Sequence, residues 1–287
     1  MKRSFLGRLQ RSALLSLIGA LLLLLVVPGL QLLVLGPQGY GVALATPQAS
    51  LTWIQGYTFL FLLYRLSLIL GFALLLALPF ALFRIIIAQE IVGRAEIEED
   101  EEEVDEEGEE EVEENVDEDE EAEEEKEAEE NNGMPAFAWR GKGFAVIAAW
   151  AGFLGLLLVA GGTLASTIYL WSSASASIPH GQLPDNFATV TSLFAVLTYT
   201  IGGGLLAISC IFFGLVIARS GRKLWPDGWV AFSYMALVTG AIASGSAVQV
   251  ALAPTGGQAT LTTPAILLIA LWALWFGIMV TRLKAEQ

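Results

Sequence analysis

The sequence predicts an all-α integral membrane protein with six transmembrane helices, and three observations lead to this fold class. The mean hydropathy is +0.61 although 30 of the 287 residues are Asp or Glu. Six stretches hold the roughly 20 mainly apolar residues that a helix needs to cross the hydrocarbon core. Backbone polar groups in lipid must be satisfied within the segment, so these continuous apolar runs favour helices.

The chain divides into three parts. Residues 1–94 are expected to form a transmembrane hairpin with helices over 12–35 and 57–88. Residues 95–132 form an acidic segment, and residues 133–287 form a four-helix portion with helices over 143–171, 190–218, 229–252 and 262–281. Proline predicts kinks or local loosening in the first two helices, at Pro28 and Pro79.

The acidic segment is the most unusual part of the sequence. Between Glu96 and Glu130 there are 26 carboxylates and a single cation, Lys126. The rest of the chain carries 14 Lys and Arg against four acids, so a polyanion lies within a basic membrane protein. With almost no apolar residues to bury, this Glu-rich cytoplasmic loop between helices 2 and 3 is expected to be disordered.

The distribution of Lys and Arg predicts the orientation. Basic residues precede the first span, flank the acidic segment, separate spans four and five and follow span six, whereas residues 36–56, 172–189 and 253–261 contain none. Cytoplasmic loops retain positive charge, so both termini and the acidic segment are expected in the cytoplasm, and the protein in the cytoplasmic (plasma) membrane.

A cleaved signal peptide is the alternative for the N-terminus. Met1–Arg11 is cationic, and Ala43-Leu44-Ala45 resembles a small-residue cleavage site. The apolar stretch of residues 12–35 is longer than an ordinary signal-peptide core, which favours an uncleaved first helix. Cleavage would leave five spans.

The sequence offers little that could carry out a reaction. Cys210 is the only cysteine and His180 the only histidine, so neither a disulfide nor a multi-histidine metal or haem site is expected within one chain. No Asp or Glu lies within the predicted spans, and no nucleophile, base and acid can be assembled. We therefore expect no enzyme activity, no cofactor and no metal, and the polyanion argues against nucleic-acid binding.

Arg65 is the strongest single candidate for a functional residue, because a charged side chain within a membrane span is costly and usually has a function. Two interpretations remain open. If the hydrocarbon region begins at Leu66, 23 residues still reach Ala88 and Arg65 extends to the headgroups. If Arg65 lies deeper, its guanidinium is a candidate contact for an anion or a lipid headgroup.

Two further features are candidates for a permeation path. Gly202, Gly203 and Gly204 are consecutive in span four, and three glycines weaken a helix. They predict a hinge, a broken helix at a solute site or a close helix crossing. Gln249 is an uncharged polar side chain in span five that could contact a solute or bond to a neighbouring helix.

Small residues at helical spacing predict the faces on which helices pack. They let backbones approach closely, which drives association in lipid. Contacts within one bundle are the first interpretation, and a homo-oligomer is the second. The candidate packing residues are Gly161 and Gly162 in span three and Gly240, Ala241, Ser244 and Gly245 in span five.

The leading functional hypothesis is a non-enzymatic multi-pass membrane protein that acts as a scaffold, assembly factor or accessory subunit. Its partners would be the lipid bilayer and a basic cytoplasmic protein that docks on the acidic segment through electrostatic steering. The segment could instead be a solvated spacer or a weak ion buffer. The alternative function is a small-solute or ion channel or transporter that uses Arg65 and the break at Gly202–Gly204.

Overall fold

A computed structural model of the chain confirms the six apolar helices. It describes residues 3–89, 136–177, 183–254 and 260–282, and no strand occurs within these ranges. Within the described ranges, six helices are long and apolar enough to cross a membrane, over Gly7–Leu35, Thr58–Gln89, Gly143–Ala176, Phe187–Ser220, Asp227–Leu252 and Thr262–Thr281. Their bounds differ from the predicted ones by a few residues at most of the ends.

Several of these spans contain more than one helical element. The first span contains α1 (Arg3–Leu21), a π-helix (Leu22–Val26), α2 (Val27–Gly29) and a second π-helix (Leu30–Leu35). The second contains α5 (Thr58–Leu74) and a 3-10 turn (Leu75–Ala77), after which the helix resumes over residues 78–89. The remaining elements are α8 (Ala136–Ser177), α9 (Phe187–Ala195), a π-helix (Val196–Gly202), α10 (Gly203–Leu224), α11 (Asp227–Leu252) and α12 (Thr262–Thr281).

The two prolines lie where the helices are irregular, as predicted. Pro28 lies in α2, between the two π-helices of the first span. Pro79 follows the 3-10 turn of the second span by two residues. Proline has no N–H and its ring clashes with the carbonyl four residues earlier, so the preceding turn must change its hydrogen-bond pattern. Both spans continue through the irregularity.

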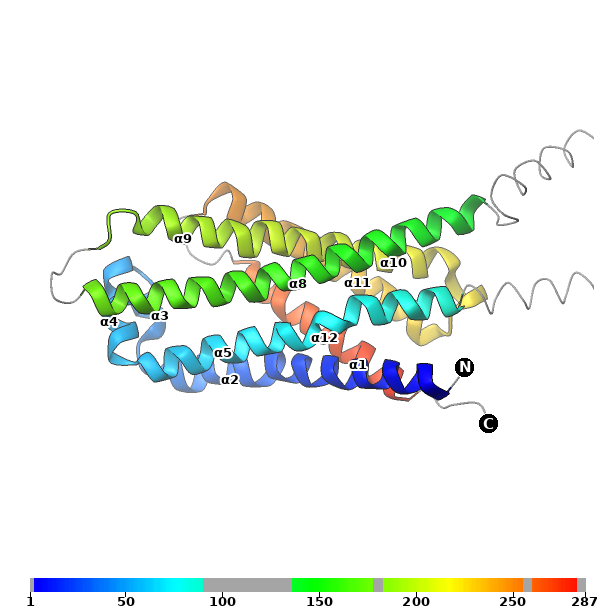
Figure 1. Ribbon diagram of the computed structural model, residues 1–287, viewed down its shortest axis with the longest axis horizontal. Coiled ribbons are helices and arrows are strands. Elements are labelled where there is room, and N and C mark those ends of the chain that lie inside the picture. The colour runs from blue at the N-terminus through cyan, green and yellow to red at the C-terminus, as the bar shows by residue number, and fades with distance from the viewer. Residues whose placement is uncertain (1–2, 90–135, 178–182, 255–259, 283–287) are drawn as a thin grey trace, which may run out of the picture.

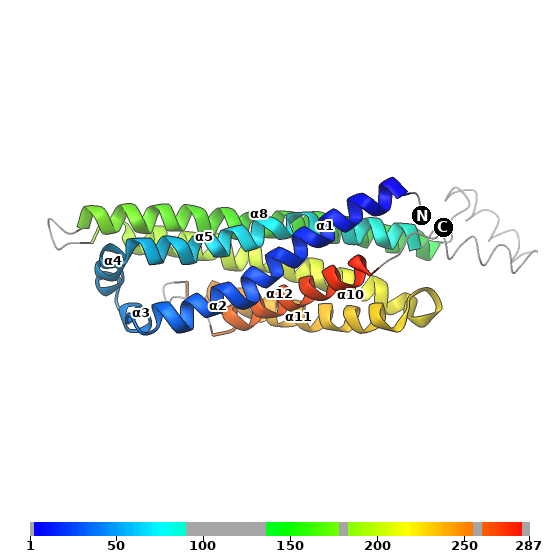
Figure 2. The same cartoon turned by 90° about the horizontal axis from the view of Figure 1, so that it is seen from below.

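The six spans lie side by side along the length of the bundle (Figures 1 and 2), and the contacts between them close a ring. Each has two ring neighbours, in the order α1, α5, α8, α10, α11, α12 and back to α1. The start of α1 and the end of α12 lie at the same end of the bundle (Figure 2). The first span therefore closes the ring between the second and the last.

Glycines mediate most of these helix contacts. A Cβ added to Gly19 of α1 would lie 2.8 Å from the carbonyl oxygen of Gly71 in α5. A Cβ on Gly277 of α12 would lie 3.1 Å from the carbonyl oxygen of Ala13 in α1, and one on Gly214 of α10 would lie 2.9 Å from that of Ser233 in α11. Only residues without a Cβ allow backbones to approach this closely, which favours helix association in lipid.

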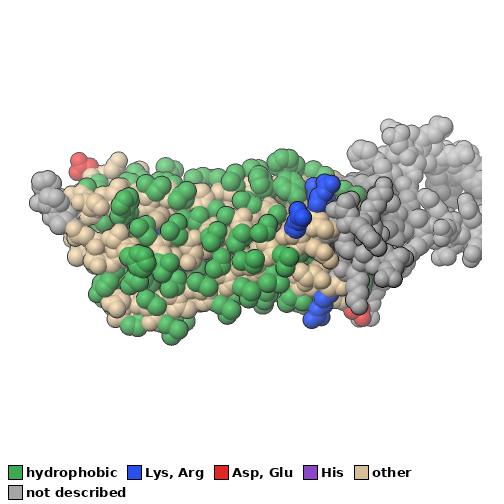
Figure 3. All heavy atoms as spheres, turned by 60° about the horizontal axis from the view of Figure 1, so that its bottom comes forward, with side chains coloured by type: hydrophobic (Ala, Val, Ile, Leu, Met, Phe, Trp, Pro, Cys, Tyr) green, Lys and Arg blue, Asp and Glu red, His purple; other side chains and the backbone are tan. Residues whose placement is uncertain are grey.

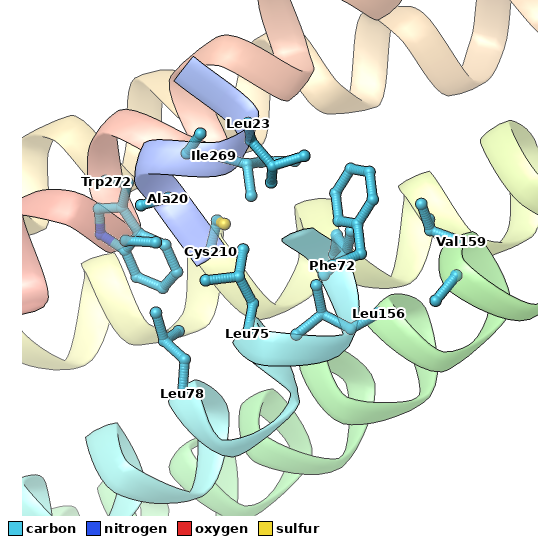
Figure 4. Packing of buried hydrophobic residues seen from close by; sticks show 14 of the residues in the cluster. Ala20, Leu23, Phe72, Leu75, Leu78, Leu156, Val159, Cys210, Ile269 and Trp272 are labelled. Atoms are coloured by element: carbon cyan, nitrogen blue, oxygen red, sulfur yellow. The ribbon is translucent and has the colours of Figure 1, made fainter. Parts of the chain in front are cut away.

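The interior of the bundle is apolar. Buried side chains from the first span, the second span, α8, α10 and α12 point toward one another, among them Leu23, Phe72, Leu156, Cys210 and Trp272 (Figure 4). The outer surface is apolar as well: Figure 3 shows hydrophobic side chains along the length of one face. Exposed apolar side chains of this extent are typical of a lipid-facing surface.

Charged side chains gather at the ends of the bundle. Near one end, which we call the basic end, lie Arg8, Arg11, Arg84, Arg219 and Arg282, from the start of α1, the ends of the second span and α10, and the residue after α12. Figure 3 shows Lys and Arg side chains collected near that end.

Two short helices, α3 (Tyr40–Ala43) and α4 (Pro47–Gly56), cover the opposite end, which we call the capped end. The chain turns into α3 at Gly39, whose φ of 77° favours glycine. The Thr46 hydroxyl oxygen accepts a hydrogen bond from the Ala49 N–H and caps α4. From the sequence we conclude only that this segment contains no Lys or Arg.

Candidate functional site

Arg65 lies in the second turn of α5, seven residues after its start. Its side chain is half-buried, and the guanidinium carbon lies 5.5 Å from the centroid of the Phe61 ring. The Nε atom is buried and has no hydrogen-bond partner among the described residues. A cation above an aromatic face is attracted by the ring quadrupole, so Phe61 supplies part of the stabilisation that a carboxylate would otherwise give.

Aromatic side chains of the cap, which is formed by α3 and α4, pack against Tyr64, the residue before Arg65. The Tyr40 ring lies 4.8 Å from that of Trp53 and 6.1 Å from that of Tyr64, measured between centroids. The Trp53 Nε1–H donates a hydrogen bond of 2.8 Å to the Gln38 carbonyl. Burial raises the pKa of the Tyr40 phenol above its ordinary value, whereas the charge of Arg65 lowers it. Arg65 is thus close enough to act electrostatically on the cap.

The spacing of two arginines favours the headgroup level for Arg65. Arg65 and Arg84 lie on the same span, 19 residues apart. At a rise of about 1.5 Å per residue, they are separated by about 29 Å. The hydrocarbon core is about 30 Å thick. One bilayer therefore accommodates both guanidinium groups at its two interfaces, without a charge in the hydrocarbon.

The three consecutive glycines do not interrupt span four, which is helical from Phe187 to Ser220. A π-helix ends at Gly202, and α10 begins at Gly203. A Cβ on Gly202 would lie 3.0 Å from Val159 Cγ2 of α8. No neighbouring atom lies within 4 Å of a Cβ added to Gly203 or Gly204. Of the three interpretations, this geometry supports the close helix crossing, and only Gly202 takes part in it.

Gln249 links the end of α11 to the residues just before α12, at the capped end. Its Oε1 accepts hydrogen bonds of 3.3 Å from the Thr260 hydroxyl and from the Leu261 N–H, just before α12. Other polar side chains also bond to neighbouring helices: Thr200 donates to the Ala247 carbonyl at 3.3 Å. These groups join α11 to its neighbours, and Gln249 does not lie together with Arg65 in a common site.

The predicted packing residues separate into inward and outward positions. Gly162 lies against Thr198, and a Cβ on Gly240 would lie 2.6 Å from Ile211 Cγ1. A Cβ on Gly245 would lie 3.0 Å from Leu261 Cδ1, whereas Gly161 faces open space. In the same helix as Gly240 and Gly245, Ala241 is exposed and Ser244 is half-buried.

Two of the voids in the described part of the bundle differ in size. The one where the second span, α8, α10 and α12 meet has a volume of about 10 Å³, roughly one water molecule, and apolar side chains dominate its lining. The other lies between α1 and the second span near the basic end and has a volume of about 280 Å³. It is lined by Leu9, Ser12, Ala77, Phe80, Ala81 and Arg84. Reasoning from the sequence did not single out this second void.

Several predictions lie outside the described residues. These are the acidic segment, which falls within residues 90–135, and His180. Within the described ranges, no group of three or more His, Cys, Asp or Glu side chains could hold a metal ion. Cys210 is buried in α10.

Comparisons with protein-family models, curated proteins and solved structures found no match. The geometry alone therefore defines the class of protein: a helical bundle with six spans apolar enough to cross a membrane.

Proposed function

We propose that this chain is a non-enzymatic multi-pass membrane protein that acts as a scaffold, assembly factor or accessory subunit. Its bundle anchors the acidic segment, which lies between the second and third spans, at the membrane surface. That segment recruits a basic cytoplasmic partner, since a dense negative charge steers a positive surface toward itself. Both termini are cytoplasmic, and the segment extends into solvent as a disordered loop.

The filled centre of the bundle is the observation that carries this proposal, since the larger void of about 280 Å³ lies between α1 and the second span near the basic end. At the junction of four spans the void measures about 10 Å³, and Leu75, Leu78, Leu156 and Ile269 are buried around it. A site for a drug-sized ligand needs about 300–1,000 Å³. A bundle packed in this way serves as an anchor.

The charge distribution supports the orientation. The described arginines of the basic end lie at the ends of spans on both sides of the acidic segment, and basic residues favour the cytoplasmic side. The cap at the other end carries no Lys or Arg in Tyr40–Ala43 or Pro47–Gly56. The second span ends and α8 begins at the basic end, so we place the intervening acidic segment on the side where a cytoplasmic protein would reach it.

Native co-purification in mild detergent tests the docking role. The intact chain is compared with a variant lacking residues 95–132, each isolated at low and at high salt. We expect a basic partner with the intact chain only, released as salt screens the charges. A matched control replaces residues 95–132 by a neutral Gly/Ser linker of equal length. The docking role would be refuted if the same proteins co-purified with all three forms. It would also be refuted if the intact chain were isolated as a monomer without a partner at every salt concentration.

A permeation role has less support in the geometry. Gly203 and Gly204 face open space, Gln249 accepts hydrogen bonds at the loop before α12, and Arg65 lies at the cap. Flux measurements in liposomes address it directly. Conductance or uptake by the wild-type chain that disappears in Arg65→Gln would favour a channel over a scaffold.

A further inference from the structure

The void between α1 and the second span, which we call the basic-end wedge, has the form of a binding site. It is partly open and has a volume of about 280 Å³, near the lower limit of ligand sites. Leu9, Ala77, Phe80 and Ala81 give it an apolar wall, and Ser12 and Arg84 add polar groups. An apolar wall with a few polar groups suits a ligand that has both kinds of surface.

Helix geometry explains why the wedge is present. Gly19 and Gly71 hold α1 against α5, since a Cβ on Gly19 would lie 2.8 Å from the Gly71 carbonyl. From this contact α1 crosses the bundle obliquely toward the basic end (Figure 2). Beyond the contact, the small side chains of Ser12, Ala77 and Ala81 leave the space between the helices unfilled.

The polar part of the wedge is cationic. The Arg84 side chain is exposed and lines the wedge. The Ser12 hydroxyl donates a hydrogen bond of 3.2 Å to the Arg8 carbonyl, so Arg8 lies one turn before Ser12 on α1. Arg8 is exposed as well. None of the six residues lining the wedge is acidic. This arrangement favours the binding of an anionic group in the wedge.

The depth of Arg84 in the bilayer indicates that the anion is the headgroup of a lipid. Arg84 lies about 29 Å along the span from Arg65, which is close to the thickness of the hydrocarbon core. With Arg65 at one headgroup level, Arg84 therefore lies at the other. Phosphates of acidic lipids lie at this level, and basic pockets between spans bind such headgroups. Deeper in the wedge, Ala77 and Phe80 offer the apolar contacts that the first part of an acyl chain needs.

We infer that the basic-end wedge binds one acidic phospholipid. The lipid phosphate contacts the Arg84 guanidinium, with Arg8 nearby and the Ser12 hydroxyl beneath. The acyl chains follow the groove between α1 and the second span toward the Gly19–Gly71 contact.

Native mass spectrometry of the full-length protein tests this inference. Phosphatidylglycerol and phosphatidylcholine with the same acyl chains are added separately to wild type, Arg84→Gln and Arg219→Gln. Arg219→Gln is the matched control, because it removes the same charge at the basic end from α10, outside the wedge. We expect wild type to prefer phosphatidylglycerol, Arg84→Gln to lose about fivefold in its affinity, and Arg219→Gln to keep it.

A second variant separates shape from charge. Ala77→Leu fills the wedge and leaves its charge unchanged, so it should also weaken phosphatidylglycerol binding, while circular dichroism reports whether the helices remain intact. Equal affinities of Arg84→Gln and Arg219→Gln, or equal binding of the two lipids to wild type, would overturn the inference. Displacement of the lipid by millimolar inorganic phosphate would overturn the assignment to lipid and indicate a free-phosphate site.

Discussion

Gly155 of α8 and Gly202 of span four meet backbone to backbone. A Cβ added to Gly155 would lie 2.9 Å from the Gly202 carbonyl oxygen and 2.9 Å from the Leu206 backbone nitrogen. Backbone atoms cannot move aside as the end of a side chain can. The contact of α8 with span four therefore depends on the absence of a side chain at Gly155.

Gly155→Ala is expected to destabilise the bundle by about 1–3 kcal/mol, the usual cost of overpacking. Gly161→Ala on the same helix is the matched control, because nothing lies within 4 Å of its added Cβ. It should be neutral or stabilise the helix by up to about 1 kcal/mol, as alanine favours helices over glycine. Thermal unfolding in detergent, followed by circular dichroism, compares the two. Equal melting temperatures would contradict this helix crossing.

The depth of the arginines can be measured with single cysteines and a membrane-impermeant maleimide on intact cells. The wild-type chain gives the background, because its only cysteine, Cys210, is buried. Arg65→Cys should be labelled from outside, and Arg84→Cys only after the membrane is permeabilised. Leu70→Cys, on the exposed side of α5, should resist labelling in both conditions because lipid covers it. Labelling of Arg84→Cys from outside would reverse the proposed orientation.

Tyr40 should make the stability of the protein depend on alkaline pH. Burial raises its pKa in the folded state, so the unfolded chain releases the proton first, from about pH 10 upward. Stability is then fully present below that pH and falls as pH rises toward the folded-state pKa. Tyr40→Phe should remove this part of the decrease and leave neutral-pH stability nearly unchanged. Unfolding curves of both proteins between about pH 8 and about pH 11 measure the difference.

The Trp272 indole offers a fourth test. Its Nε1 is buried without a hydrogen-bond partner among the described residues, and its ring stacks on Phe232 at 5.2 Å between centroids. An unpaired buried donor costs roughly 1–3 kcal/mol. Trp272→Phe keeps an aromatic ring and removes that donor, so it should be neutral or stabilising by chemical unfolding. Trp272→Ala should cost about 3–5 kcal/mol, since it leaves a cavity. A large loss in Trp272→Phe would indicate that Nε1 is bonded.

The helices could be predicted from the sequence, because each span is a continuous apolar run whose length the bilayer sets. Their arrangement could not. Gly161 and Gly162 are neighbours in the same small-residue pattern, yet Gly162 lies against Thr198 and Gly161 faces open space. One residue turns a helix face by about 100°. The position of a partner helix decides which of the two packs, and that position depends on contacts distant in sequence.

The candidate site was predicted in part. Arg65 stands out because it is charged within an apolar run, but the packing of Tyr40 on the neighbouring Tyr64 depends on α3, which was not predicted from the sequence. The wedge was missed because no single residue marks it: Ser12 and Arg84 become neighbours only through the oblique course of α1. The interval of 19 residues between Arg65 and Arg84 is visible in the sequence, but it indicates the depth of Arg84 and not the void.

Because the helices form a closed ring, the chain could start at a different helix while every helix keeps the same two neighbours. Because α1 packs on α12, and both the start of α1 and the end of α12 lie at the basic end, a linker could join them without disturbing a helix neighbour. New ends opened within residues 95–132 would give a circular permutant that begins with α8 and finishes with the second span. Such a chain would present the acidic segment as two free tails in place of one loop.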